Sequence, residues 1–252
     1  MVLPTATATV DCAGMSGRIA DGAYHSLILQ QDIPFRIYLP PCYDEMGKAY
    51  PVLYLLHGTP LASSDWERMG VTELATAEIQ KGEWPAFIMI MPHAPASMYT
   101  NTDGGPNSFE AELVEGLVSY IDLTYRTDPR PQARVLAGIS RGGVWALEIG
   151  LRNPDVFSSV AAVSPALAVN NARPPYDPLV IARNLAHAPH LFLLAGDHDW
   201  ARQGTEQMDQ VLTAGGIPHE YVVFPGMHEL AAWEASLKPL LTSLVSGWAT
   251  QQ

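Results

Sequence analysis

The sequence has few basic residues and no cluster of them. Lys and Arg together number 14, against 26 Asp and Glu, so the formal net charge is −12. Proteins that bind nucleic acids need a basic surface, and the acidic balance predicts no nucleic-acid partner. Charged residues make up only 16% of the chain and hydrophobic residues 48%, which favours a folded domain with a large core over a disordered chain.

Long apolar runs are also missing. No run approaches the roughly 20 residues that a membrane-spanning helix needs, so we expect no membrane span. The first residues have neither a basic region nor an apolar region of the kind that marks a signal peptide. They look like the start of a mature chain from which a signal has been removed. We therefore expect a secreted or periplasmic protein, although many cytosolic proteins are equally acidic.

Cysteine is scarce, since Cys12 and Cys42 are the only two. We predict that they form a disulfide, which would tie an N-terminal extension (residues 1–23) to the loop after a strand. Two separate buried thiols are the alternative. Closing a loop of about 30 residues would stabilise the fold by roughly 3–4 kcal/mol in the chain-entropy model. A disulfide would also favour an extracellular or periplasmic setting.

What the chain does contain is an alternation of short apolar runs and helical stretches. Two runs, Ser26–Gln31 and Phe35–Leu39, flank the turn Asp32–Pro34 and predict an antiparallel hairpin. The later runs are apolar on both faces, as in a parallel sheet that helices cover. We therefore predict a single α/β domain over residues 1–252. Its further strands are expected at 52–57, 87–91, 135–139, 160–163, 191–195 and 221–224, and its helices at 72–81, 109–123, 143–152, 206–214 and 230–248.

The sharpest motif is Gly138-Ile139-Ser140-Arg141-Gly142. It follows a predicted strand and opens a predicted helix, which is the setting of a nucleophile elbow. Side chains two residues before and after the serine would collide on such a tight turn, which accounts for the two glycines. The five-residue motif alone also arises by chance, so its strand–turn–helix setting carries the prediction that Ser140 is a nucleophile.

A serine nucleophile needs a base, and in this fold the base is a histidine that follows the acid along the chain. His228 comes directly after the last predicted strand, at the same sheet edge as Ser140. The remaining downstream candidates, His187, His190 and His219, end a helix or begin a strand. We interpret them as surface or capping residues.

Two aspartates compete for the role of the acid. Asp197 directly follows the turn glycine after a strand and could bond the amides of its own turn. Asp199 lies further out, where it could reach a histidine on the next loop, and we prefer it. A metal site formed by Asp197, His198 and Asp199 lacks further ligands nearby, and the mechanism needs neither metal nor cofactor.

Two backbone N–H groups must stabilise the oxyanion of a tetrahedral intermediate. The residue after the nucleophile supplies one of them, which gives Arg141. The loop after the strand at 52–57 supplies the other, and Thr59 is the candidate because Pro60 has no N–H. His57 ends the same strand, and we expect it to hold this loop rather than to act in catalysis.

These motifs resemble the putative-esterase family of α/β hydrolases, which includes feruloyl and acetyl-xylan esterases, S-formylglutathione hydrolases, enterochelin esterases and mycolyltransferases. The similar segments are Tyr54–Gly58, Ser64–Trp66, Tyr125–Thr127, Ala137–Gly143 and Gly226–His228, with Phe35–Pro41 as an entry strand. The resemblance implies an α/β-hydrolase fold with helices on both faces of a mostly parallel sheet. It also implies ester hydrolysis with Ser140, Asp199 and His228 as the triad, and Thr59 and Arg141 as amide donors. The chain departs from the family at Pro60-Leu61 and at Met227, and neither departure removes a catalytic group.

The segment between the strands at 160–163 and 191–195 is too short for a helical lid domain. We therefore expect an open cleft, with Trp66, Tyr99 and Trp200 as candidate substrate-binding residues; core packing is the alternative for the two tryptophans. Such a cleft suits a feruloyl-type or other aryl ester, as a small molecule or linked to a polysaccharide, and short acyl esters are the second choice. Acyl transfer to a sugar hydroxyl and a non-catalytic binding module are further alternatives. The sequence says nothing about oligomeric state.

Overall fold

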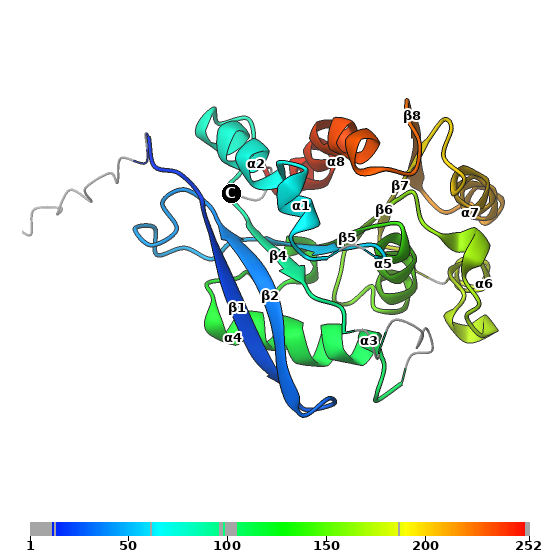
Figure 1. The fold of residues 1–252 in the computed structure, drawn as a ribbon, viewed down its shortest axis with the longest axis horizontal. Coiled ribbons are helices and arrows are strands. Elements are labelled where there is room, and N and C mark those ends of the chain that lie inside the picture. Colours follow the sequence, from blue (N-terminus) through cyan, green and yellow to red (C-terminus); the bar gives the residue numbers. More distant parts are fainter. Residues whose placement is uncertain are drawn as a thin grey trace, which may run out of the picture.

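The computed structural model describes residues 12, 14–60, 62–95, 98, 105–185 and 187–249. One eight-stranded sheet runs through them in the order β1-β2-β4-β3-β5-β6-β7-β8 (Figure 1). Strand β2 is antiparallel to both of its neighbours, and all other neighbours are parallel. The strands are β1 Arg18–Ser26, β2 Gln31–Leu39, β3 Val52–Leu56, β4 Ile88–Pro92, β5 Arg134–Ile139, β6 Ser159–Val163, β7 His190–Gly196 and β8 His219–Phe224.

Helices cover both faces of this sheet, as predicted. Alternate residues of the central strands enter two separate hydrophobic cores, because successive side chains of a strand point to opposite faces. Helices α1, α2 and α8 close one core, and helices α3 to α7 close the other (Figure 1). The bounds are α1 Asp65–Arg68, α2 Val71–Gln80, α3 Phe109–Ala111, α4 Ser119–Thr124, α5 Arg141–Arg152, α6 Pro178–Ala182, α7 Arg202–Ala214 and α8 Leu230–Ala249. This is the α/β-hydrolase architecture that the sequence predicted.

The N-terminal hairpin exists, but it was predicted too far along the chain. The expected strand Ser26–Gln31 is mostly the turn, and β1 begins at Arg18, within the expected N-terminal extension (residues 1–23). The chain reverses at Leu27–Gln30, where Gln30 adopts a φ of 53°, and Asp32–Pro34 lies inside β2. A proline interrupts a strand only where its missing N–H is needed. Pro34 offers its carbonyl oxygen to the N–H of His93 instead, so the strand continues through it.

The predicted helix over residues 109–123 is also present, with an irregular middle. A π-helix at Glu112–Val118 separates α3 from α4. Its first residue, Glu112, is buried and accepts a hydrogen bond of 2.6 Å from the hydroxyl of Ser26 at the end of β1. The hydrogen bond attaches this helix to the N-terminal hairpin.

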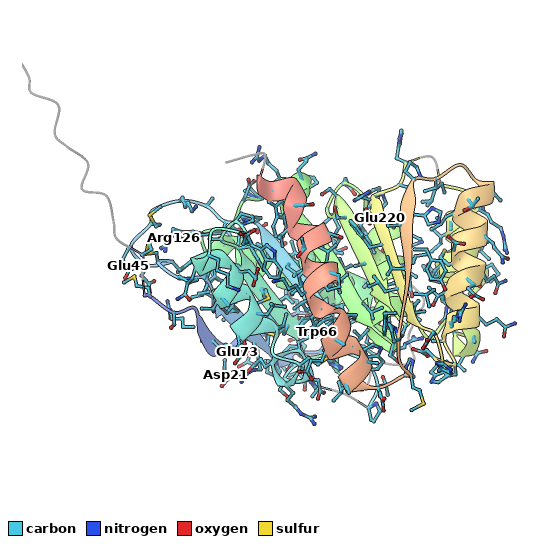
Figure 2. All side chains as sticks on the ribbon, turned by 90° about the horizontal axis from the view of Figure 1, so that it is seen from above. Asp21, Glu45, Trp66, Glu73, Arg126 and Glu220 are labelled. Atoms are coloured by element: carbon cyan, nitrogen blue, oxygen red, sulfur yellow. A yellow bond between two sulfur atoms is a disulfide. The ribbon has the colours of Figure 1, made fainter. Side chains whose placement is uncertain are left out.

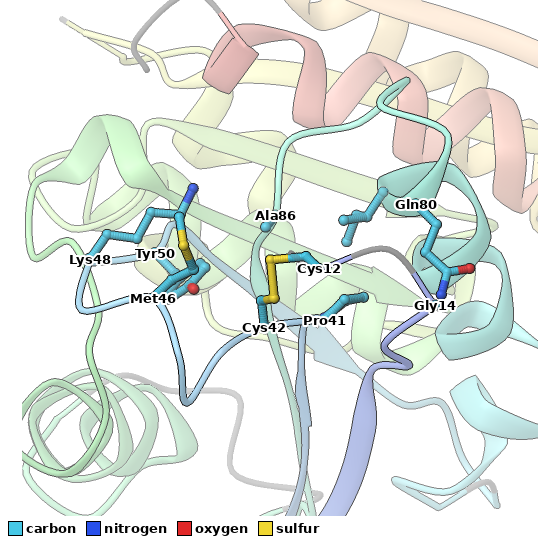
Figure 3. Close-up of a pocket in the computed structure, with 10 residues that line it drawn as sticks. Cys12, Gly14, Pro41, Cys42, Met46, Lys48, Tyr50, Gln80 and Ala86 are labelled. Atoms are coloured by element: carbon cyan, nitrogen blue, oxygen red, sulfur yellow. A yellow bond between two sulfur atoms is a disulfide. The ribbon is translucent and has the colours of Figure 1, made fainter. Parts of the chain in front are cut away.

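The predicted disulfide is present. Cys12 and Cys42 are bonded, with their Cα atoms 5.6 Å apart and 30 positions apart along the chain. Figure 3 shows the bond in the wall of a cavity of about 520 Å³, opposite Gln80 of α2. The bond therefore fastens the segment before β1 to the loop that follows β2.

Removal of this disulfide is expected to lower stability without changing the sheet. The Cys12→Ser/Cys42→Ser double variant should lose roughly 3–4 kcal/mol of unfolding free energy, because the unfolded chain regains the freedom of a closed loop. Urea unfolding measures the loss. The wild-type protein with a reductant should match the double variant, and a reductant should not affect the double variant. An unchanged midpoint would show that the bond does not support the fold.

Between β6 and β7, the described residues form α6, of five residues, and two short 3₁₀ turns. These described residues form no helical cap over the sheet edge. Among the helices of the described residues, none combines the length and the apolar character needed to cross a membrane.

Candidate active site

The Gly-x-Ser-x-Gly motif forms a tight turn between β5 and α5. Ser140 has φ 54° and ψ −116°, a conformation that costs free energy for a residue with a side chain. Three backbone hydrogen bonds hold it there: its N–H donates to Val163 at the end of β6, and its carbonyl oxygen accepts from the N–H groups of Val144 and Ala166. The surrounding backbone thus fixes the strained residue, as expected of a nucleophile elbow.

Both glycines of the motif are required by close backbone contacts. A Cβ atom on Gly138 would lie 2.1 Å from the carbonyl oxygen of Gly142. A Cβ atom on Gly142 would lie 2.4 Å from the carbonyl oxygen of Leu56, at the end of β3. The sequence argument from collision is confirmed for both positions, and the second collision involves the neighbouring strand.

Gly142→Ala is therefore expected to damage both stability and activity. Its Cβ meets backbone atoms that cannot rotate away, so the elbow must shift; overpacking of this kind costs roughly 1–3 kcal/mol or more. A shift of the nucleophile by about 1 Å should reduce kcat about 100-fold. Gly47→Ala is a suitable control, because nothing lies within 4 Å of its added Cβ. Thermal unfolding and ester turnover measure both effects, and equal behaviour of the two variants would contradict this account of the elbow.

Three side chains from separate loops meet at the carboxyl edge of the sheet. His228 Nε2 lies 2.9 Å from Ser140 Oγ, and His228 Nδ1 lies 2.8 Å from Asp199 Oδ1. A neutral imidazole that donates from Nδ1 to the carboxylate leaves Nε2 free to accept the serine proton. The structure thus brings together the three residues that the sequence singled out.

The carboxyl group of Asp199 is buried, yet its pKa lies below the ordinary value. Burial alone raises this pKa, but the hydrogen bonds from His228 and from the Ala201 amide, together with the nearby Ser164 side chain, lower it by more. The Ala201 N–H donates to Oδ1 at 2.7 Å. Asp199 is therefore an anion at neutral pH, and it is hydrogen-bonded to Nδ1 of His228.

Asp197, the other candidate for the acid, has hydrogen-bond partners other than His228. Its Oδ1 accepts the backbone N–H of Gly226 at 2.9 Å and lies 2.7 Å from Nδ1 of the exposed His198. These hydrogen bonds stabilise the turns after β7 and β8. In the described part of the chain, no group of three or more His, Cys, Asp or Glu side chains could hold a metal ion.

The loop after β3 is held by His57, as the sequence suggested. His57 Nδ1 lies 2.7 Å from the carbonyl oxygen of Gly58, and Nε2 accepts the N–H of Ala94 at 3.1 Å. These bonds require a neutral ring protonated at Nδ1, and burial lowers the pKa of His57 accordingly. The side chain thus joins the loops after β3 and β4, next to Thr59.

The second predicted amide donor, Arg141, is the first residue of α5. Its guanidinium donates to Asn170 Oδ1 at 3.1 Å and lies 5.0 Å from the ring centre of Trp145. Burial lowers the pKa of this guanidinium. These contacts fix the residue that directly follows Ser140 and attach it to the loop after β6.

Of the two described aromatic residues proposed for substrate binding, Trp200 lies at the surface beside the triad. Its side chain is 51% exposed, and its ring centre lies 4.4 Å from that of His228. Trp66 is 0% exposed and packs in the core beside α8, so its placement at the cleft was wrong and its core alternative holds (Figure 2). Tyr99 lies outside the described residues.

Sequence reasoning missed two residues at this site. Trp233, on α8, packs edge-on to His228 with ring centres 4.9 Å apart and an interplanar angle of 83°. Its Nε1 donates to Ser164 Oγ at 3.0 Å, and Ser164 directly follows β6. Both are buried. The only local signal is a Ser-Pro pair after a strand, and such a pair alone does not indicate a place in an active site.

The fold and the elbow define this chain as an α/β hydrolase. The model of the family described as Putative esterase matches residues 26–244, and the chain belongs to that family. The chain is 28% identical over 217 residues to an endo-1,4-beta-xylanase/feruloyl esterase of Xylanibacter ruminicola, a match that covers 82% of this chain. It is 29% identical over 133 residues to an esterase of Mycobacterium tuberculosis, over 51% of this chain. Each match covers 28% of the relative's own length.

Solved structures share the fold at lower identity. A ferulic acid esterase superposes with a TM-score of 0.83 at 22% identity, covering 93% of this chain and all of that one. An S-formylglutathione hydrolase of Staphylococcus aureus gives 0.79 at 18% identity, over 91% of this chain and 99% of the other. A ferulic acid esterase of Anaeromyces mucronatus in complex with ferulic acid gives 0.77 at 21% identity, over 96% and 95%. At these identities the likeness shows a common fold.

Proposed function

We propose that this chain is a serine carboxylic-ester hydrolase that forms an acyl-enzyme on Ser140. The main support is the 2.9 Å contact between Ser140 Oγ and His228 Nε2, with Asp199 behind the imidazole. His228 takes the proton of Ser140 as the hydroxyl attacks the ester carbonyl. The backbone N–H groups of Thr59 and Arg141 stabilise the oxyanion that forms.

His228 then returns its proton to the leaving alcohol, which completes the acyl-enzyme. In the second half of the reaction a water molecule attacks the acyl carbonyl with His228 again as base, and His228 returns this proton to Ser140 as the carboxylic acid leaves. Asp199 stays ionised throughout and stabilises the imidazolium. A sugar hydroxyl in place of water would convert the hydrolase into an acyltransferase, so adding a sugar acceptor and analysing the products tests that alternative.

The proposed substrate is a feruloyl-type or other aryl ester, free or linked to a polysaccharide. The half-exposed Trp200 ring beside His228 supports this, because aromatic rings pack well against one another. Met227, which directly precedes His228 in the chain, is a further exposed apolar residue. The names of the xylanase/feruloyl esterase relative and of the ferulic acid esterase structures support the same substrate class. The Cys12–Cys42 disulfide supports a secreted or periplasmic location.

Trp200→Ala separates recognition of an aryl acyl group from general effects on the base. We expect kcat/KM for methyl ferulate to fall about tenfold more than kcat/KM for methyl acetate, because, of the two substrates, only methyl ferulate has an aromatic ring that loses its partner. Any effect of the substitution on His228 lowers kcat/KM for both substrates equally, so it cancels in the ratio of the two values. Equal losses, or wild-type turnover of acetyl esters with none of methyl ferulate, would contradict the aryl-acyl proposal and leave short acyl esters as the substrates.

A further inference from the structure

The two carboxylate oxygens of Asp199 differ in the hydrogen bonds that they accept. Oδ1 accepts hydrogen bonds from His228 and from the Ala201 amide. Oδ2 is buried and, within the described residues, has no partner that meets hydrogen-bond geometry. A buried carboxylate oxygen without a donor is costly, so a nearby donor is expected to serve it.

Ser164 carries a hydroxyl group that acts on the Asp199 carboxyl group. The residue is fully buried, and its φ of 48° places it in the left-handed region. Its N–H donates to Leu194 of β7 at 2.7 Å, which holds it beside the strand from which the Asp199 turn departs. The side chain also contributes to the lowered pKa of Asp199, after burial and the His228 hydrogen bond.

The hydrogen bond from Trp233 determines whether the Ser164 hydroxyl acts as a donor or as an acceptor toward Asp199. The indole Nε1–H donates to Ser164 Oγ at 3.0 Å, and an indole N–H can only donate. A hydroxyl that accepts one hydrogen bond keeps its own hydrogen for another acceptor. With the oxygen fixed by Trp233, that hydrogen is free to point to the Asp199 carboxylate.

We propose that Ser164 is a positioning residue for the acid of the triad, donating its hydroxyl hydrogen to Asp199 Oδ2 while Trp233 holds its oxygen. The ring of Trp233 also packs edge-on to His228, so α8 supports the base and, through Ser164, the acid. The chain of contacts runs from Trp233 through Ser164, Asp199 and His228 to Ser140. This inference rests on the proposed function, since it assigns a role in the same reaction.

Loss of the Ser164 hydroxyl should change the pH profile in a defined direction. Without this donor the Asp199 carboxylate is less stabilised, so its pKa rises and it attracts the protonated imidazole of His228 more strongly. His228 is the titratable group whose charge acts on Asp199. Both effects favour the protonated, inactive form of the His228–Asp199 pair, so the acidic limb of the kcat/KM profile moves to higher pH.

The experiment compares Ser164→Ala with Trp233→Phe and Ser236→Ala. Trp233→Phe keeps a ring against His228 but removes the N–H that holds Ser164. Ser236→Ala removes another buried hydroxyl, one that donates to the carbonyl oxygen of Trp233 and does not contact Asp199. For Ser164→Ala we expect kcat to fall about tenfold with little change in KM, and the acidic limb to move up by about half a pH unit or more. Trp233→Phe should move it in the same direction by less, and Ser236→Ala should not move it.

A second readout does not depend on turnover. The proton NMR resonance of His228 Nδ1–H reports the hydrogen bond to Asp199, and it should shift in Ser164→Ala and Trp233→Phe but not in Ser236→Ala. An acidic limb and a resonance in Ser164→Ala that match those of Ser236→Ala would overturn the inference. If Ser164→Ala does not fold, an unchanged profile and resonance in Trp233→Phe overturn it instead. A wild-type protein that turns over no ester contradicts the proposed function, whereas the NMR comparison still tests the Ser164 contact.

Discussion

Ser140→Ala is expected to reduce kcat by roughly 10⁴–10⁶-fold while the protein stays folded. The hydroxyl is the only group at the elbow that can form the acyl-enzyme, and the methyl group that replaces it cannot be activated by His228. The substitution removes one oxygen atom from a residue whose backbone is held by Val163 and Ala166, so thermal stability should change little. Single-turnover and steady-state rates with an aryl acetate measure the loss.

His228→Ala should produce a loss of similar size, because the serine cannot be deprotonated without its base. The double variant Ser140→Ala/His228→Ala should be no slower than either single variant, since residues that act as one unit are not additive. Multiplicative losses in the double variant would show that the two residues act independently, contrary to the 2.9 Å contact between them.

Asp199→Asn is expected to reduce kcat by roughly 10³–10⁴-fold, because an amide cannot balance the imidazolium charge and favours the wrong tautomer of His228. Asp197→Asn provides a matched control two residues away on the same turn. Asp197 accepts hydrogen bonds from the backbone amide of Gly226 and from the exposed His198, and neither donor belongs to His228. Its substitution should change kcat by less than about threefold.

The contrast between these two variants decides which aspartate is the acid. A large loss in Asp197→Asn with a small one in Asp199→Asn would reverse the assignment. Thermal unfolding of both variants separates an effect on the reaction from damage to the turn, and we expect Asp197→Asn to affect stability more than turnover.

Much of this fold was predictable because the governing patterns are local. Short apolar runs predicted the bounds of the parallel strands to within a residue or two, because a short run that is apolar on both faces is typical of a strand buried in a parallel sheet. The motif around Ser140 combines a strand, a strained turn and a helix within a few residues. His228 and Asp199 then followed from chain order, because the loops after parallel strands share one edge of the sheet.

The failures concern features that depend on neighbours far apart in the chain. The turn was placed at Pro34, although pairing with β4 keeps this proline inside β2. A tryptophan after a loop fits a core or a cleft equally well, and only the packing of α8 places Trp66 in the core. Ser164 gains its importance from Trp233, 69 positions along the chain, and no local pattern records such a contact.

Labelling with a fluorophosphonate probe tests the central claim most directly, because the probe reacts with an activated serine and needs no knowledge of the substrate. We predict that the wild-type protein forms a single covalent adduct, that peptide mass spectrometry places it on Ser140, and that Ser140→Ala is not labelled. A wild-type protein that does not react, or a Ser140→Ala variant that is labelled as fast as wild type, would contradict the assignment of Ser140 as the nucleophile.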